Sequence, residues 1–208
     1  MKKKWGILLV FLFLATGCST MTKSRSFIHP ESDFSFYQKV GVLPFTNQAE
    51  DRFAGEKLIE NFITELLIWG NLAVMDTGQL NGVVAQVAKI SGPGVSQELS
   101  PTHLGQIAQV AGVQGLFMGT VHDYKMIQLG GEQYPMISMT LKFIDAPTGT
   151  IVWQNTVSAV GGPNLPIVSI GESFTLGQLS QKICKDMASN FFESAYPKSF
   201  FDVLEGLK

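Results

Sequence analysis

Apolar and polar positions follow two different periods along this chain. In four segments the apolar residues recur at steps of three and four, which is typical of amphipathic helices. These segments cover about residues 51–69, 79–89, 100–111 and 172–194. Asp76 or Thr77 can cap the second helix, and Ser100 followed by Pro101 favours the start of the third.

The strand signals divide into two groups. Residues 39–45 and 72–75 are short apolar runs, and the first suits a buried parallel strand. Later in the chain three longer runs show apolar and polar alternation, and turn signals separate them. They cover residues 115–127, 135–144 and 151–159, and they indicate an antiparallel meander. Residues 90–99 and 160–171, rich in Gly, Pro and Ser, are predicted loops.

The resulting order is β α β α α β β β α. This order predicts an α/β fold: a mixed sheet of about five strands, with two parallel strands early, an antiparallel meander late, and helices packed on it. We expect one domain over residues 38–194.

The first 18 residues have the composition of a secretory signal. Lys2, Lys3 and Lys4 precede an apolar run of 11 residues, Trp5–Ala15, and small residues follow. As a helix this run would reach roughly 16 Å, whereas a membrane span needs about 30 Å. We therefore expect residues 1–17 to be a cleaved signal peptide.

The segment Leu14-Ala15-Thr16-Gly17-Cys18 resembles the bacterial lipobox, with Ala15 in the place where Leu is common. The resemblance implies that Cys18 becomes the first mature residue and carries a diacylglycerol and an N-linked acyl chain such as palmitate. Two or more chains anchor a protein stably. An ordinary secreted protein cleaved nearby is the alternative. Ser19 follows, and the usual sorting rule then implies the outer membrane, with the domain on the periplasmic side.

Two flanking segments are predicted outside the domain. Residues 18–37 would hold the lipidated Cys18 and a polar tether with a reach of about 20–25 Å. Residues 195–208 form an amphipathic tail in which Phe200, Phe201 and Leu204 are candidate partner-binding residues. The alternative is that this tail packs on its own domain.

Charge and cysteine content narrow the function classes. Removal of residues 1–17 leaves 12 basic against 17 acidic residues, a net charge of −5. Such a surface argues against nucleic-acid binding, which needs clustered Lys and Arg. If Cys18 is lipidated, Cys184 has no intramolecular partner, and its place on an apolar helix face predicts a buried small residue.

Motifs for catalysis and cofactor binding are absent from the sequence. There is no Walker loop, no GxGxxG after a strand, no GxSxG and no HExxH. His29, His103 and His122 lie far apart, without metal-ligand spacing. His122 and Asp123 are adjacent in a predicted strand, so their side chains should point to opposite faces. We therefore expect no catalytic residues, no metal site, no cofactor and no enzyme activity.

Several spaced segments carry a family resemblance. They are residues 39–47, 74–76, 111–121 and 143–153, including the hairpin Asp145-Ala146-Pro147-Thr148-Gly149. Together they resemble the periplasmic domain of the curli assembly/transport component. They are also similar to lipoproteins that activate penicillin-binding proteins and to the N-terminal domain of the Tol translocation component. The connection 128–134 is shorter than the membrane-inserted hairpins of curli-type channels would need.

These observations predict an outer-membrane lipoprotein that binds a protein partner in cell-envelope or secretion-apparatus assembly, with homo-oligomers possible. One alternative is a subunit of a curli-type oligomeric secretion channel. Another is a small-ligand-binding protein or hydrolase, which would need a deep polar pocket with converging His or acidic residues.

Overall fold

The computed structural model describes residues 22–90, 92, 95–162 and 173–197. The strands are β1 (Thr22–Ile28), β2 (Lys39–Val42), β3 (Thr46–Asn47), β4 (Ala73–Val74), β5 (Gly115–Leu129), β6 (Glu132–Asp145) and β7 (Thr150–Val160). The helices are α2 (Ala54–Trp69), α3 (Thr77–Ala88), the single turn α4 (Val95–Glu98), α5 (Pro101–Ala111) and α6 (Leu176–Ala195), with a short 3-10 turn η1 (Phe34–Phe36).

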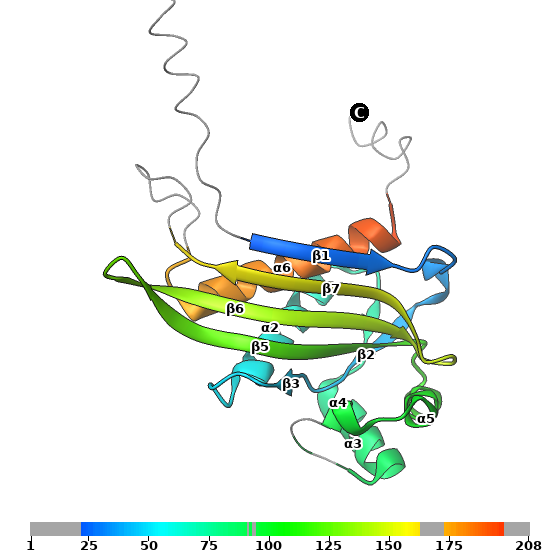
Figure 1. Cartoon of the computed structure of the whole chain (residues 1–208). Coiled ribbons are helices and arrows are strands. Elements are labelled where there is room, and N and C mark those ends of the chain that lie inside the picture. Colours follow the sequence, from blue (N-terminus) through cyan, green and yellow to red (C-terminus); the bar gives the residue numbers. More distant parts are fainter. Residues whose placement is uncertain (1–21, 91, 93–94, 163–172, 198–208) are drawn as a thin grey trace, which may run out of the picture.

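One open mixed sheet forms the centre of the molecule (Figure 1). Its order is β1-β7-β6-β5-β2-β4, and β3 pairs with β5 beyond the end of β2. β2 is parallel to both β4 and β5, whereas β5, β6, β7 and β1 pair antiparallel. The predicted α/β fold class is therefore confirmed, with both the early parallel strands and the late meander in place.

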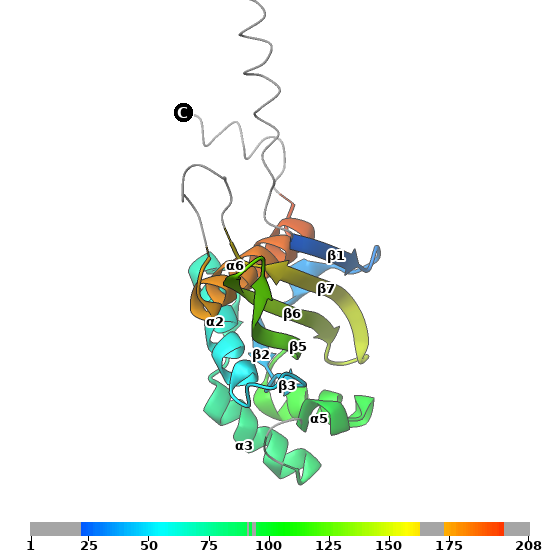
Figure 2. The ribbon, with the colours of Figure 1, turned by 60° about the vertical axis from the view of Figure 1, so that its left-hand side comes forward.

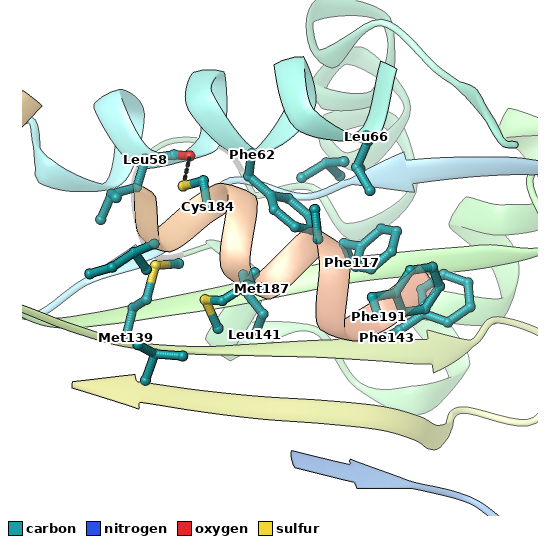
Figure 3. Packing of buried hydrophobic residues seen from close by; sticks show 14 of the residues in the cluster. Leu58, Phe62, Leu66, Phe117, Met139, Leu141, Phe143, Cys184, Met187 and Phe191 are labelled. Carbon is teal, nitrogen blue, oxygen red and sulfur yellow. Dashed lines mark hydrogen bonds between the residues drawn. The ribbon is translucent and has the colours of Figure 1, made fainter. Parts of the chain in front are cut away.

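Helices cover the two faces of the sheet unequally. α2 and α6 pack on one face, while α3, α4 and α5 cover the opposite face near β2 and at the β6–β7 turn (Figure 2). The larger core cluster joins α2 and α6 to the covered face of the meander through buried rings such as Phe62, Phe117, Phe143 and Phe191 (Figure 3). The smaller cluster joins α3 and α5 to Leu43 and Leu116.

The predicted helix starts agree with the observed caps. The carboxylate of Asp76 accepts a hydrogen bond from the Gln79 amide at the start of α3. Ser100 caps α5, with Pro101 in its first turn. Thr175 caps α6 in a capping box with Gln178. Each cap supplies an acceptor for an amide that has no partner within the helix, so these local residues define where the helices begin.

The segment before β2 differs from the prediction. A polar tether was expected over residues 19–26, but Thr22–Ile28 pair with β7 along their whole length as the edge strand β1. The Ser24 hydroxyl donates to Oδ1 of Asn155 at 2.9 Å and so satisfies a buried amide. Lys23 and Arg25 are charged residues of the kind that protect sheet edges from further pairing.

The aromatic residues that follow β1 close the end of the core. Phe34 and Tyr37 are buried, as expected for side chains that cover the domain edge, whereas Phe27 and Phe36 are exposed. The Phe34 ring lies 5.9 Å from the Phe191 ring of α6. Residues 22–37 therefore belong to the folded domain, and its start lies earlier than the predicted residue 38.

Candidate functional site

The predicted lipidation site and the candidate partner-binding residues lie outside the described ranges. This applies to Cys18 and to the tail residues Phe200, Phe201 and Leu204. Cys184 is described and is fully buried, as predicted. Its thiol donates to the backbone oxygen of Leu58 at 3.5 Å (Figure 3), and burial raises its pKa. A thiol held protonated in the core is a packing group and a poor nucleophile.

The three histidines have separate surroundings. Nδ1 of His29 accepts a hydrogen bond from the Glu31 amide, and His103 completes the capping box of α5. His122 lies on β5, away from both. Among the described residues no group of three His, Cys, Asp or Glu side chains is close enough to hold a metal ion.

His122 and Asp123 do not point to opposite faces, so the prediction from simple alternation was wrong. The pairing of β5 with β6 shifts between Val121 and Asp123, which makes His122 the extra residue of a β-bulge. Asp123 then lies opposite Ser138, while Nε2 of His122 contacts Oγ1 of Thr140 at 3.0 Å. Ser138 and Thr140 occupy one face of β6, so both neighbouring residues of β5 share that face.

A row of hydrogen bonds crosses the meander on this face. Nδ1 of His122 contacts Oε1 of Gln48 at 3.1 Å, and its other ring nitrogen contacts Thr140. The Thr140 hydroxyl also lies 3.0 Å from the hydroxyl of Thr156 on β7. The row therefore links the segment after β3 to β5, β6 and β7.

Beyond the end where α5 packs against Ile144 and Ile151, no helix of the described chain lies over this face of β6 and β7 (Figures 1 and 2). We call it the open sheet face; its polar members are Lys23, Arg25, Thr120, His122, Asp123, Lys125, Ser138, Thr140, Lys142, Gln154, Thr156 and Ser158. Lys125 pairs with Asp123 at 2.7 Å, and the hydrogen bond raises the lysine pKa. With four cationic groups and one carboxylate, the face is locally basic on an acidic chain.

The open sheet face could be predicted only in part from the sequence. The alternation of Ser138, Thr140 and Lys142 with large apolar residues marks a polar face on β6. The contributions of Lys23 and Arg25 depend on a strand that composition did not predict, and the position of Asp123 depends on the bulge.

A separate crevice of about 400 Å³ lies between α2 and α3, at the carboxyl end of β2. In open α/β sheets this is a common place for ligands. Its walls are mainly apolar, with Val42, Phe45, Ile59, Ile63 and Val84, and its polar groups include Glu56, Glu60 and Asn81. Among the described residues that line it there is no histidine, cysteine or lysine. The crevice thus offers an apolar floor with carboxylates and no nucleophile–base pair.

In the part of the chain that the structure describes, no helix combines the length and the apolar character needed to cross a bilayer.

Comparison with known proteins gives the fold. No family model and no curated protein matches the sequence. Solved structures that match in architecture include the following three. The PelC dodecamer from Paraburkholderia phytofirmans is 17% identical, with a TM-score of 0.54 over 81% of this chain and 96% of that chain. Lipoprotein GNA1162 from Neisseria meningitidis is 16% identical, with a TM-score of 0.53 over 73% and 99%.

The third structure, CT253 from Chlamydia trachomatis, is 14% identical, with a TM-score of 0.53 over 78% of this chain and 99% of that chain. At these identities the likeness extends to the fold. This fold therefore occurs in a bacterial lipoprotein and in a protein that assembles as a dodecamer. The resemblance to the curli component stays a prediction.

Proposed function

We propose that this protein is a periplasmic lipoprotein, anchored in the outer membrane through Cys18, that binds a protein partner during assembly of the cell envelope or a secretion apparatus. The lipobox-like segment that ends at Cys18 carries the proposal. The fold supports it, because Lipoprotein GNA1162 has the same architecture. The mechanism is tethering: the lipid holds the domain at the membrane and raises its concentration near a partner there.

The chemistry of the described residues favours binding over catalysis. The two ring nitrogens of His122 contact Gln48 and Thr140, and Asp123 is paired with Lys125. The described lining of the crevice beside α2 includes carboxylates but no histidine, cysteine or lysine. A hydroxyl-rich, locally basic sheet face instead suits a partner that presents acidic groups, because complementary charge fixes orientation and speeds encounter.

The anchor is tested on the protein made in its own host. We expect the purified mature chain to begin at Cys18 and to carry acyl chains by intact mass measurement. Globomycin should cause the precursor to accumulate, and Cys18→Ala should abolish acylation. An unacylated N-terminus in the wild-type protein would overturn the proposal.

The partner surface is tested by photocrosslinking in intact cells. A photoreactive residue at Thr156, on the open sheet face, should give a specific adduct. The same residue at Gln109, exposed on α5, provides the matched control. Equal adducts from both positions, or none from the open sheet face in cells that contain the acylated protein, would contradict binding there.

Self-assembly is a second candidate, favoured by the likeness to a dodecamer. In that case copies of this chain are the partners, and a curli-type channel would be one form of the assembly. Native mass spectrometry of the detergent-extracted, acylated protein distinguishes the two. A ring of many subunits supports self-assembly, and a monomer that captures another protein supports the first candidate.

A further inference from the structure

One end of the sheet gathers the start of β1, the end of β7 and the turn between β5 and β6. Thr22 pairs with Ala159, and the next residue of β7, Val160, pairs with Met136 of β6. The β5–β6 turn lies further along in the same direction, where Leu129 pairs with Glu132. In Figure 1 the start of β1 and the end of β7 lie toward the left-hand side of the sheet, and the β5–β6 turn projects beyond them.

Large apolar side chains are exposed at this end. Met126 is 40% exposed and Leu129 is 52% exposed near the β5–β6 turn. Phe174 is 47% exposed. Its neighbour Ser173 forms a β-bridge with Gly162, and the amide of Gly161 donates to the backbone oxygen of Pro135. Since Pro135 pairs with Met126, Phe174 lies near the β5–β6 turn. We call Met126, Leu129 and Phe174 the hairpin end.

The charges at this end are balanced, with two lysines and two carboxylates, and Lys125 is paired with Asp123. Lys23 is the second residue of β1, and Lys125 directly precedes Met126. Glu132 lies at the turn and accepts a hydrogen bond from the hydroxyl of Tyr134. Lysines beside exposed apolar side chains suit an interface with anionic headgroups.

The short distance in sequence from Cys18 to β1 decides which end faces the membrane. Only residues 19–21 separate Cys18 from Thr22. Four residue steps span at most about 14 Å, even in a fully extended chain. The 14 residues of β6 extend for about 45 Å. A lipid on Cys18 therefore keeps the start of β1 close to the bilayer.

Exposure alone would not have selected this end. Phe36, Leu67 and Ile68 are exposed as well. Phe36 lies beyond the far end of β1, and Leu67 and Ile68 belong to the last turn of α2. The position of β1 distinguishes the two ends. Three residues after the anchor are too short for the opposite end of the sheet to lie on the membrane with the hairpin end pointing away from it.

We infer that the hairpin end rests on the lipid surface, with Met126, Leu129 and Phe174 at the boundary between headgroups and acyl chains. The inference rests on the proposed lipidation of Cys18 and adds an orientation to it. In this orientation the strands extend away from the membrane surface. The open sheet face then faces sideways into the periplasm, where an envelope partner can reach it.

The test places a fluorescent label at each end of the acylated, full-length protein. Leu129→Cys and Ile68→Cys each introduce one surface thiol, and Cys184 is buried and resists labelling. Each variant is labelled with NBD and reconstituted in phosphatidylethanolamine–phosphatidylglycerol vesicles that contain doxyl lipid. We expect a blue-shifted, strongly quenched signal at 129 and a water-like signal at 68.

Phe174→Cys gives a second position at the hairpin end that should behave like 129. Equal quenching at 129 and 68, or quenching at 68 alone, would overturn the inference. So would a water-like signal at both 129 and 174.

Mass measurement and vesicle flotation of the same samples separate the two claims. An acylated protein that floats with vesicles but shows no lipid contact at the hairpin end refutes the orientation and leaves the proposed function intact. A chain without acyl groups refutes both.

Discussion

The two faces of the β5–β6–β7 meander come from alternate residues of the same three strands, yet their chemistry is opposite. On the covered face Leu141, Phe143 and Trp153 are fully buried against α6. On the open sheet face the hydroxyls of Thr140 and Thr156 contact each other, and both threonines and Lys142 are partly exposed. The comparison separates stability from recognition: changes to the covered face should alter folding, whereas changes to the open sheet face should alter binding.

The largest effect is expected from Phe191→Ala on α6. The Phe191 ring is fully buried and lies 5.0–5.2 Å from the rings of Phe117, Phe143 and Trp153. Removing a buried ring of this kind leaves a cavity and should lower the free energy of unfolding by about 3–5 kcal/mol. Urea denaturation measures this.

Lys142→Ala is the control for that experiment, since Lys142 lies on the opposite side of the sheet from Phe143, its neighbour in β6. We expect a change below about 0.5 kcal/mol. Similar losses in the two variants would show that the open sheet face also contributes to folding, and the contrast between the faces would fail.

Two glycines give changes of opposite sign. A Cβ atom on Gly119 of β5 would lie 2.5 Å from the Phe45 ring, so Gly119→Ala should destabilise the fold by about 1–3 kcal/mol through overpacking. A Cβ atom on Gly82 of α3 would meet nothing within 4 Å. Gly82→Ala should therefore stabilise it by about 0.5–1 kcal/mol, because alanine favours the helix. Thermal melting of both variants tests the pair, and equal shifts would argue against the packing of Phe45 on β5.

The Cys184 thiol makes the covered face sensitive to pH. Burial raises its pKa in the folded state, whereas an unfolded thiol has a pKa of about 8.5. Above that value the unfolded chain loses a proton that the folded chain keeps, so the stability contribution is complete below about pH 8.5 and falls as the pH rises. The wild-type free energy of unfolding should drop by about 1–2 kcal/mol between pH 8 and 9.8.

Cys184→Ala serves as the reference for this titration. It should lower the free energy of unfolding at neutral pH, because a buried sulfur is lost, and it should flatten the dependence above pH 8. A variant with the same alkaline slope as the wild type would assign that slope to other groups.

Sequence reasoning predicted the parts of the fold that local chemistry determines. Asp76, Ser100 and Pro101 lie at observed helix starts, and the alternation in residues 135–144 gives both faces of β6. It missed β1 because Lys23, Ser24 and Arg25 have no apolar pattern. That strand forms through backbone pairing with β7 and through the contact of Ser24 with Asn155, neither of which is local in sequence.

The candidate surface was harder to predict than the fold. A strict period of two separates His122 from Asp123, but a bulge breaks the period and puts both on the open sheet face. The residues near His122 in sequence do not predict the bulge, because the bulge is defined by the register between β5 and β6. The same dependence on distant pairing hides the row through Gln48, Thr140 and Thr156.

A small effect on stability is expected from Thr140→Val, which changes the open sheet face without altering its shape. The valine keeps the branched side chain that suits a strand but loses the hydroxyl that contacts His122 and Thr156. Since this row is only partly buried, the loss of stability should be about 1 kcal/mol or less.

The photocrosslink from Thr156 should nevertheless fall several-fold, because a partner would meet a face with an altered histidine position and one hydroxyl fewer. Gln106→Leu, a polar-to-apolar change on α5, should leave the crosslink unchanged. Full crosslinking in the Thr140→Val protein would show that the partner does not bind at the open sheet face. The face would then serve neither stability nor recognition.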